Sequence, residues 1–138
     1  MFRNGVWIIG TLLIFVVLFA MAYVRVAPLD PLRWHVPIEA SADEDLTGGA
    51  VRVIAGDDAT FRALDAEAQN LKRTRVLAGS LAEGRITYVT RSFFFGFPDL
   101  TTIEQAGEEI RLYGRLRFGA SDLGVNRNRL ERLIAAAQ

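Results

Sequence analysis

The longest apolar run of the chain lies at its N-terminus. Residues 6–24 contain no charged side chain, and Arg3 and Arg25 flank them. Nineteen residues in an α-helix span roughly 28 Å, close to the hydrocarbon thickness of a bilayer. Trp7 and Tyr23 lie near the two ends of the run, where amphipathic rings favour the headgroup level. The pattern predicts a transmembrane anchor over residues 1–25.

A cleaved signal peptide is the alternative interpretation of the same run. Arg3 would form its basic start, and Ala20-Met21-Ala22 would form a small-x-small cleavage site. Apolar residues continue past that cut, which favours a retained helix. The short N-terminal tail and the export-like pattern favour a cytoplasmic N-terminus with the domain outside. We therefore expect a single-pass protein of a bacterial inner membrane with a periplasmic domain.

The hydrophobic period is lost over residues 26–49. The prolines of this segment are Pro28, Pro31 and Pro37. Proline favours extended backbone, so the pattern predicts a semi-rigid stalk that runs along the membrane surface, with Trp34 near the interface. Adjacent carboxylates at residues 43–45 seldom converge on a metal ion, and they are expected to be solvated.

Apolar residues return with regular spacing in residues 50–138. Phe61, Leu64 and Ala68 fall at spacings of three and four, which predicts an amphipathic helix capped near Asp57 and Asp58. Strands are predicted at residues 51–54, 75–77, 85–91, 100–105 and 109–118, with turn signals between them. A last helix is predicted from Ser121, with Leu123, Leu130, Leu133 and Ile134 on one face.

These elements predict an α+β fold. It combines one N-terminal transmembrane helix with a small antiparallel-sheet domain that two helices pack against.

Strand 109–118 separates two kinds of side chain by its alternation. One face holds Ile110, Leu112, Gly114, Leu116 and Phe118, and the other holds Arg111, Tyr113, Arg115 and Arg117. Three cations on one face repel each other unless something neutralises them. Internal ion pairs with Glu104 or Glu109, an anionic ligand or lipid headgroup, and an acidic partner surface are the alternatives.

Composition narrows the possible functions. The chain has no cysteine, which excludes disulfides, thiol nucleophiles and cysteine-ligated metals. Its one histidine, His35, lies outside the predicted domain, so triads and histidine metal sites lack their usual component. The net charge is zero, which does not favour nucleic-acid binding. We expect no catalytic residues, no metal and no cofactor.

Two strings of the sequence form recognisable motifs. One runs from Arg115 to Arg129 and contains Ser121-Asp122-x-Gly124-x-Asn126-Arg127-x-Arg129, and the other is Tyr88-Val89-Thr90-Arg91-Ser92 followed by Phe97-Pro98-Asp99. They resemble the signature of domain-of-unknown-function family fourteen ninety-nine (DUF1499), small and often membrane-anchored bacterial and plastid proteins. Gly114 and Leu116 replace serines that are usual in that family. The resemblance implies the architecture and no activity.

The motif residues have a structural and a functional interpretation. In the first, Ser121 or Asp122 caps the last helix and an arginine–aspartate network fixes the fold. In the second, arginines bind an anion or a partner and polar neighbours orient them. The arginines are Arg91, Arg115, Arg117, Arg127 and Arg129, and the neighbours are Asp99, Ser121, Asp122 and Asn126.

The phenylalanine run also has two interpretations. Phe93, Phe94, Phe95 and Phe97 either form an exposed interaction patch for a partner protein or the bilayer, or pack their rings into the core.

The sequence therefore favours a non-catalytic accessory or assembly subunit of a membrane protein complex. The alternative is a module that binds an anionic small molecule or lipid headgroup through the arginine cluster. The expected partners are the lipid bilayer and a membrane complex.

Overall fold

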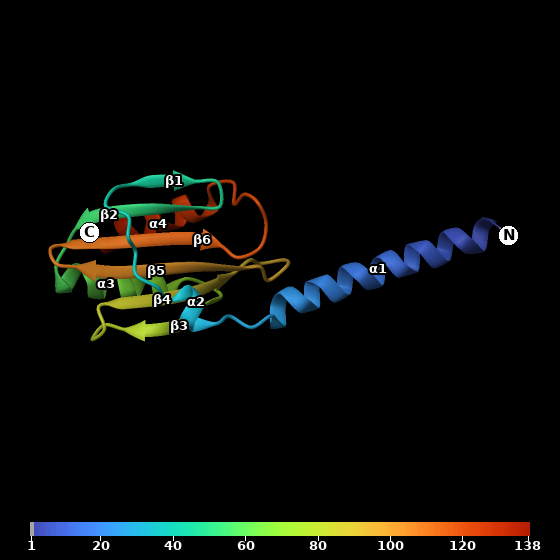
Figure 1. Ribbon diagram of the computed structural model, residues 1–138, viewed down its shortest axis with the longest axis horizontal. Helices are drawn as coiled ribbons and strands as arrows, with labels where there is room; N and C mark the ends of the chain where they lie inside the picture. The colour runs from blue at the N-terminus through green and yellow to red at the C-terminus, as the bar shows by residue number, and fades with distance from the viewer. Residues whose placement is uncertain (1) are drawn as a thin grey trace.

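The computed structural model describes residues 2–138 of the chain. A long helix, α1 (Phe2–Val26), extends away from a domain built on one sheet (Figure 1). The other elements are α2 (Pro31–Trp34), β1 (Glu44–Leu46), β2 (Gly49–Ala55), α3 (Asp58–Asn70), β3 (Thr74–Ser80), β4 (Arg85–Arg91), β5 (Pro98–Ala106), β6 (Glu109–Leu116) and α4 (Val125–Ala137).

Over its segment Gly5–Val26, helix α1 leaves its apolar side chains outside the core of the protein. Its segment Gly5–Val26 is long and apolar enough to cross a membrane, and none of it is buried inside the protein. Leucine and phenylalanine side chains that stay exposed over a whole helix favour a lipid environment. The helix ends at Val26, one residue beyond the end of the anchor predicted from the sequence.

The sheet of the described chain has six antiparallel strands in the order β1-β2-β6-β5-β4-β3. Strands β3 to β6 form the predicted meander. Helix α3 carries the chain from β2 to β3, which is the strand at the far edge of the sheet. The α+β prediction is confirmed. The short edge strand β1 was not predicted, because three exposed residues carry no alternation of apolar and polar positions.

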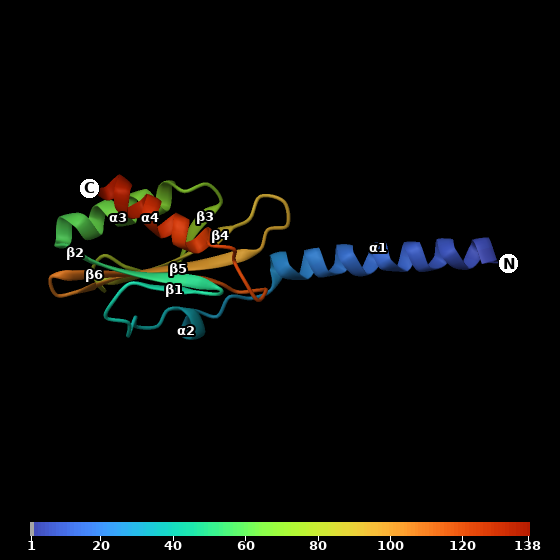
Figure 2. The ribbon, with the colours of Figure 1, turned by 90° about the horizontal axis from the view of Figure 1, so that it is seen from above.

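Helices α3 and α4 cover one face of the sheet (Figure 2). The predicted stripe of α3 supplies Phe61, Leu64 and Ala68 to the core, and α4 supplies Leu130 and Leu133. These side chains meet Ile86, Tyr88, Ile103, Ile110 and Leu112 of the sheet. The burial of this apolar surface is the main stabilising contribution to the fold.

One polar pair lies inside this core. The hydroxyl of Tyr88 donates to the Asp65 carboxylate at 2.7 Å. Burial raises the pKa of Tyr88 above its ordinary value of 10.0, and the charge of Asp65 raises it further. The phenol therefore stays protonated and keeps its hydrogen bond at neutral pH.

The segment between α1 and β1 differs from the predicted stalk. Residues 27–43, here called the connecting segment, lie against the sheet face opposite α3 and α4 (Figure 2). Ala27 and Ile38 are each only 4% exposed. Asp30 caps the single turn of α2 by accepting from the Leu32 amide at 3.0 Å. The segment with the three prolines packs on the sheet and does not form a free stalk. It does so because arginines of the sheet face donate hydrogen bonds to its main-chain carbonyls.

Two smaller predictions for this region also change. The guanidinium of Arg115 lies over the Trp34 ring, 5.5 Å from the ring centroid, so Trp34 packs on the sheet. The acidic run is not a free linker, since Asp45 forms a 2.8 Å ion pair with Arg52 and Asp43 lies 3.9 Å from the same guanidinium.

Helix α4 begins later than predicted. Gly124 is its N-cap in the left-handed conformation, and Leu123 is also left-handed with φ of 52°. Two successive left-handed residues interrupt an α-helix, so Leu123 cannot share a helical face with Leu130. Leu123 is 90% exposed, and its predicted place in the core is wrong.

Candidate functional site

The alternation predicted for β6 is confirmed, and it places the arginines on the face that the connecting segment covers. Arg111, Tyr113 and Arg115 point to this face, while Ile110 and Leu112 enter the core with α3 and α4. Strand β6 itself ends at Leu116, so Arg117 lies just beyond it.

Three arginines of this face bind main-chain oxygens of the connecting segment. Arg111 donates to Ile38 at 3.0 Å, Arg115 donates to Trp34, and Arg117 donates to Ala27 at 3.1 Å. We call these three residues the arginine clamp. A carbonyl satisfies a guanidinium N–H but does not neutralise its charge. The clamp therefore fixes the connecting segment without cancelling the cations beneath it.

Arg115 is enclosed by the protein itself. It is 9% exposed, its guanidinium lies 4.5 Å from the Tyr113 ring centroid, and it donates to the Thr102 hydroxyl at 3.2 Å. Burial lowers the pKa of Arg115 from its ordinary value. Its donors are directed at protein groups, which supports the structural interpretation for this residue.

Internal ion pairs, one of the three alternatives for this face, form in part. Arg111 lies 3.6 Å from the carboxylate of Glu109, as expected. Glu104 pairs with Arg85 of the neighbouring strand. The two residues sit opposite each other in the β4–β5 register, which the sequence spacing did not reveal.

The phenylalanine loop, residues 92–97 between β4 and β5, is tied to the end of α1 (Figure 1). Arg25 donates to the main-chain oxygen of Phe94 at 3.0 Å. Arg91 donates to Gly96 at 2.9 Å and to Val24 at 3.4 Å. Both arginines thus join the helix to the loop.

All four phenylalanines of the predicted patch are exposed. The exposed fractions are 70% for Phe93, 74% for Phe94, 50% for Phe95 and 40% for Phe97. Core packing of alternate rings is therefore absent in this loop.

A second polar network lies on the helix-covered side of the sheet. Arg129 donates to the Asn126 side chain at 2.5 Å and lies 3.3 Å from the Asp99 carboxylate. Burial raises the pKa of Asp99, although the charge of Arg129 works in the opposite direction. Asn126 is completely buried, so this network also stabilises the start of α4.

Asp122 links this network to the helix terminus. It accepts from the Asn126 amide at 2.9 Å and from the Gly124 amide at 3.0 Å. Burial acts to raise its pKa, but these hydrogen bonds outweigh it and hold the pKa below the ordinary value. Asp122 thus satisfies an amide in the first turn of α4, while Gly124 occupies the N-cap position.

A cavity of about 340 Å³ opens beside the network, at the end of the domain that meets α1. Its lining includes the predicted residues Arg91, Phe97, Asp99, Ser121, Asp122 and Arg129, together with Arg73, Thr90, Ser92, Leu116, Phe118 and Val125. This membrane-end cavity is the candidate site, because it gathers most of the two sequence motifs. Its walls combine charged groups with aromatic and aliphatic ones.

Not all predicted site residues meet there. Arg115 and Arg117 lie beneath the connecting segment, on the sheet face opposite Asp99, and do not line the cavity, while Arg127 is exposed on α4 with Asp45 at 3.4 Å. The strand register places Arg91 on the same sheet face as Arg117. The structure therefore does not gather Arg91, Arg115, Arg117 and Arg127 in this cavity. Positions 127 and 129 are about 200° apart around a helix, which separates their side chains.

Sequence reasoning missed Arg73 as a member of this region. It donates to the main-chain oxygen of Arg91 at 3.0 Å and lies over the ring of Phe93 at 5.4 Å. The predicted meander gave a signal, since the start of β3 must lie beside the end of β4. The left-handed backbone of Arg73, with φ of 57°, has no such signal in the sequence.

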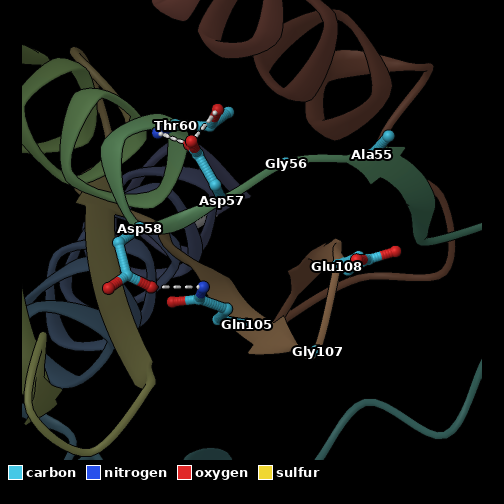
Figure 3. A pocket seen from close by; sticks show the side chains of 8 residues that line it. All are labelled: Ala55, Gly56, Asp57, Asp58, Thr60, Gln105, Gly107 and Glu108. Carbon is cyan, nitrogen blue, oxygen red and sulfur yellow. Dashed lines mark hydrogen bonds between the residues drawn. The ribbon is translucent and has the colours of Figure 1, made fainter.

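A larger cavity, of about 800 Å³, lies at the other end of the domain (Figure 3). Asp57 caps α3 by accepting from the Thr60 amide at 3.0 Å, and this bond lowers its pKa. Asp58 accepts from the Gln105 side chain at 2.7 Å. Both carboxylates hold the α3 terminus, as predicted for Asp57. Within residues 2–138 no group of three potential metal ligands comes together.

The family described as "Protein of unknown function (DUF1499)" matches residues 30–136. The chain belongs to the DUF1499 family. The resemblance of the two motifs is thereby confirmed. The DUF1499 match begins at the N-cap of α2, so the family unit includes most of the connecting segment and leaves out α1. No catalytic family is indicated. No curated protein matches the sequence.

Proposed function

We propose that this DUF1499 protein is a single-pass, membrane-anchored accessory subunit that presents its membrane-end cavity to a partner in the same membrane. The observation that carries the proposal is that hydrogen bonds join the end of α1 directly to the domain. Arg117 binds the oxygen of Ala27, the first residue after α1, and Arg91 reaches Val24 inside it. The cavity is thus held at the level where α1 would leave the bilayer.

The chemistry of the cavity favours binding over catalysis. The Asp99 carboxylate is engaged by Arg129 and Asn126, so it is not a free general base. His35 lies on the other face of the sheet, where its Nδ1 meets the Thr87 hydroxyl at 2.9 Å. A cavity with aromatic and charged walls fits a partner's side chains.

The proposed topology has the N-terminus in the cytoplasm and the domain in the periplasm of a bacterial inner membrane. It rests on the apolar run and its few flanking charges. Protease added to spheroplasts should digest the domain and spare a tag at the N-terminus. The intact mass of the purified chain should include residues 1–25, whereas a cleaved signal peptide would remove most of them.

The partner is tested by blocking the cavity. Full-length tagged protein is purified from its own membranes in mild detergent, as the wild type and as Ser121→Trp, which places a large ring at the cavity wall. Ser80→Trp, exposed at the end of β3, is the matched control. A stoichiometric partner should accompany the wild type and Ser80→Trp but not Ser121→Trp. Wild-type protein that always emerges alone would contradict the accessory role.

A second candidate function is the binding of an anionic small molecule or lipid headgroup. One observation favours it, namely that Arg73 and Arg91 line the cavity without an ion pair among the described residues.

A further inference from the structure

Four arginines gather where the domain meets α1. Arg91 ends β4, Arg75 lies on the same sheet face of neighbouring β3, Arg117 follows β6, and Arg25 is in the last turn of α1. We call these the membrane-end arginines. Among residues 2–138 none of the four forms an ion pair, whereas Arg52, Arg85, Arg111, Arg127 and Arg129 each do.

The partners that these arginines do have are uncharged. Arg25 binds main-chain oxygens of the phenylalanine loop, and Arg117 binds Ala27. Burial lowers the pKa of Arg91, and the nearby charges of Arg75, Arg117 and Arg25 lower it further. Like charges gathered at one end of a domain are stabilised by an anion between them.

In the described part of the chain, no carboxylate forms an ion pair with these arginines. Asp99 and Asp122 are at the same end of the domain, but they belong to the helix-covered side. Asp99 is bound by Arg129, and Asp122 accepts two main-chain N–H groups of the α4 terminus. The positive charge of the membrane-end arginines is therefore left for something outside the chain.

The phenylalanine loop lies directly beside this charge. The rings of Phe93 and Phe94 are the most exposed of the loop, and they contact each other edge to face at 4.9 Å. The main-chain oxygen of Phe94 accepts a hydrogen bond from Arg25, so the loop lies at the end of a helix that is apolar enough to cross a membrane. Exposed aromatic rings at that level fit the interfacial layer of a bilayer.

We propose that the membrane-end arginines bind the phosphate of an anionic phospholipid headgroup while Phe93 and Phe94 enter the interfacial layer. The proposal rests on the membrane anchoring proposed above and adds a second contact with the bilayer. Its occupant is a lipid because the surface is continuous with α1, and an anionic lipid because the cluster is cationic. Arginine is suited to phosphate, since its planar fork donates two parallel hydrogen bonds.

The headgroup is tested on the full-length protein in mild detergent. Native mass spectrometry measures the binding of added phosphatidylglycerol and phosphatidylcholine to the wild type and to Arg75→Gln. Arg75 suits this test because it is exposed and makes only a long bond, 3.4 Å, to the Val76 oxygen. Arg62→Gln, an exposed arginine on α3, is the matched control. We expect phosphatidylglycerol to bind preferentially, with Arg75→Gln weakening its binding by roughly fivefold and Arg62→Gln leaving it unchanged.

Three outcomes would overturn the headgroup assignment. Equal binding of the two lipids by the wild type would remove the preference for negative charge. Equal loss in Arg75→Gln and Arg62→Gln would show a general charge effect. Displacement of phosphatidylglycerol by inorganic phosphate at equal concentration would mark a site for free anions.

The loop is tested by its depth in a bilayer. The chain has no cysteine, so Phe94→Cys supplies one site for a nitroxide label on the full-length protein, and Leu81→Cys at the β3–β4 turn is the control. In phosphatidylglycerol-containing vesicles the label at position 94 should be relaxed by oxygen and shielded from a water-soluble nickel chelate. Equal exposure of both labels to the chelate would overturn the insertion. Carbonate extraction of the same vesicles shows separately whether α1 anchors the chain.

Discussion

The Nη1 atom of Arg117 lies 3.1 Å from the main-chain oxygen of Ala27. Ala27 in turn donates from its amide to Tyr23, inside α1, at 2.7 Å. One arginine just beyond the end of β6 thus bonds to the residue that still belongs to the hydrogen-bond ladder of the anchor. The link spans 90 residues of sequence. The domain is therefore joined to its helix by a direct hydrogen bond and not only by a flexible linker.

Replacing this arginine should weaken both the fold and the coupling. Arg117→Met keeps most of the aliphatic stem and removes a charged donor, so we expect the free energy of unfolding to fall by about 2 kcal/mol. Arg62→Met, which removes an exposed arginine from α3, is the control and should change little. Denaturant unfolding of the full-length protein in mild detergent measures both. Equal stability of the two variants would show that the clamp bond does not contribute.

Leu123, just before α4, and Leu130, within α4, should respond very differently to truncation. Leu130 is fully buried in the core, while Leu123 is 90% exposed. Leu130→Ala leaves a cavity and should destabilise the domain by roughly 2–5 kcal/mol. Leu123→Ala removes no core contact and should have almost no effect on the same unfolding curve. A large effect at Leu123 would mean that the left-handed turn before α4 packs against something in the folded state.

A methyl group at Gly49 should be poorly tolerated. A Cβ there would come within 2.2 Å of the main-chain oxygen of Gly114 on the paired strand β6. The strands must separate locally to accept it, so Gly49→Ala should lower the midpoint of thermal unfolding, with a cost of roughly 1–3 kcal/mol. Gly10→Ala is the control, because a Cβ at Gly10 meets nothing within 4 Å. An unchanged midpoint for Gly49→Ala would contradict the close approach of β2 and β6.

The raised pKa of Asp99 predicts the sign of one pH dependence. Its native pKa lies above the unfolded value of 3.8 because its side chain, 18% exposed, is largely removed from water. Between these two values the native state binds more protons than the unfolded state, so the contribution of Asp99 to stability falls as pH rises through its native pKa. That contribution is fully present below the unfolded value.

The comparison with Asp99→Asn isolates this effect from other carboxylates. Asp57 and Asp122 have lowered pKa values and contribute in the opposite direction, but they are common to both proteins. The free energy of unfolding of the wild type, minus that of Asp99→Asn, should therefore increase as pH falls from neutral towards 4. A difference that stays constant over this range would contradict the raised pKa.

The sequence predicted those parts of the fold that depend on local periodicity. Alternation assigned Arg111 and Arg115 to one face of β6 and Leu112 to the other, because successive side chains of a strand point in opposite directions. Spacings of three and four assigned Leu64 to the core face of α3. Both signals need only a few neighbouring residues, and both are confirmed.

The packing of the connecting segment on the arginine face could not be predicted from local periodicity. The acceptors of Arg111, Arg115 and Arg117 are main-chain oxygens, which every residue possesses and which leave no trace in the sequence. The prolines of the connecting segment were consistent with a stalk or with a chain packed on a sheet. Long-range proximity, such as that between Arg117 and Ala27, decides between these, and no local pattern encodes it.

The sequence indicated several residues that line the candidate site but did not indicate how they are arranged. Asp99, Asp122 and Arg129 line one cavity, which the shared motif suggested. Arg127 was placed with them only because it is adjacent in sequence. The sheet that separates Arg117 from Asp99 was predicted, but the register that places them on opposite faces was not used.

The main-chain nature of the clamp acceptors has a consequence for how this protein can diverge. A substitution in the connecting segment changes a side chain but leaves the oxygen that an arginine binds. Relatives should therefore be free to vary most of residues 27–43 while retaining arginine at positions 111, 115 and 117. Natural variation would then differ between the two sides of one interface: the connecting segment, which accepts the hydrogen bonds, would vary, and the arginine clamp, which donates them, would stay constant.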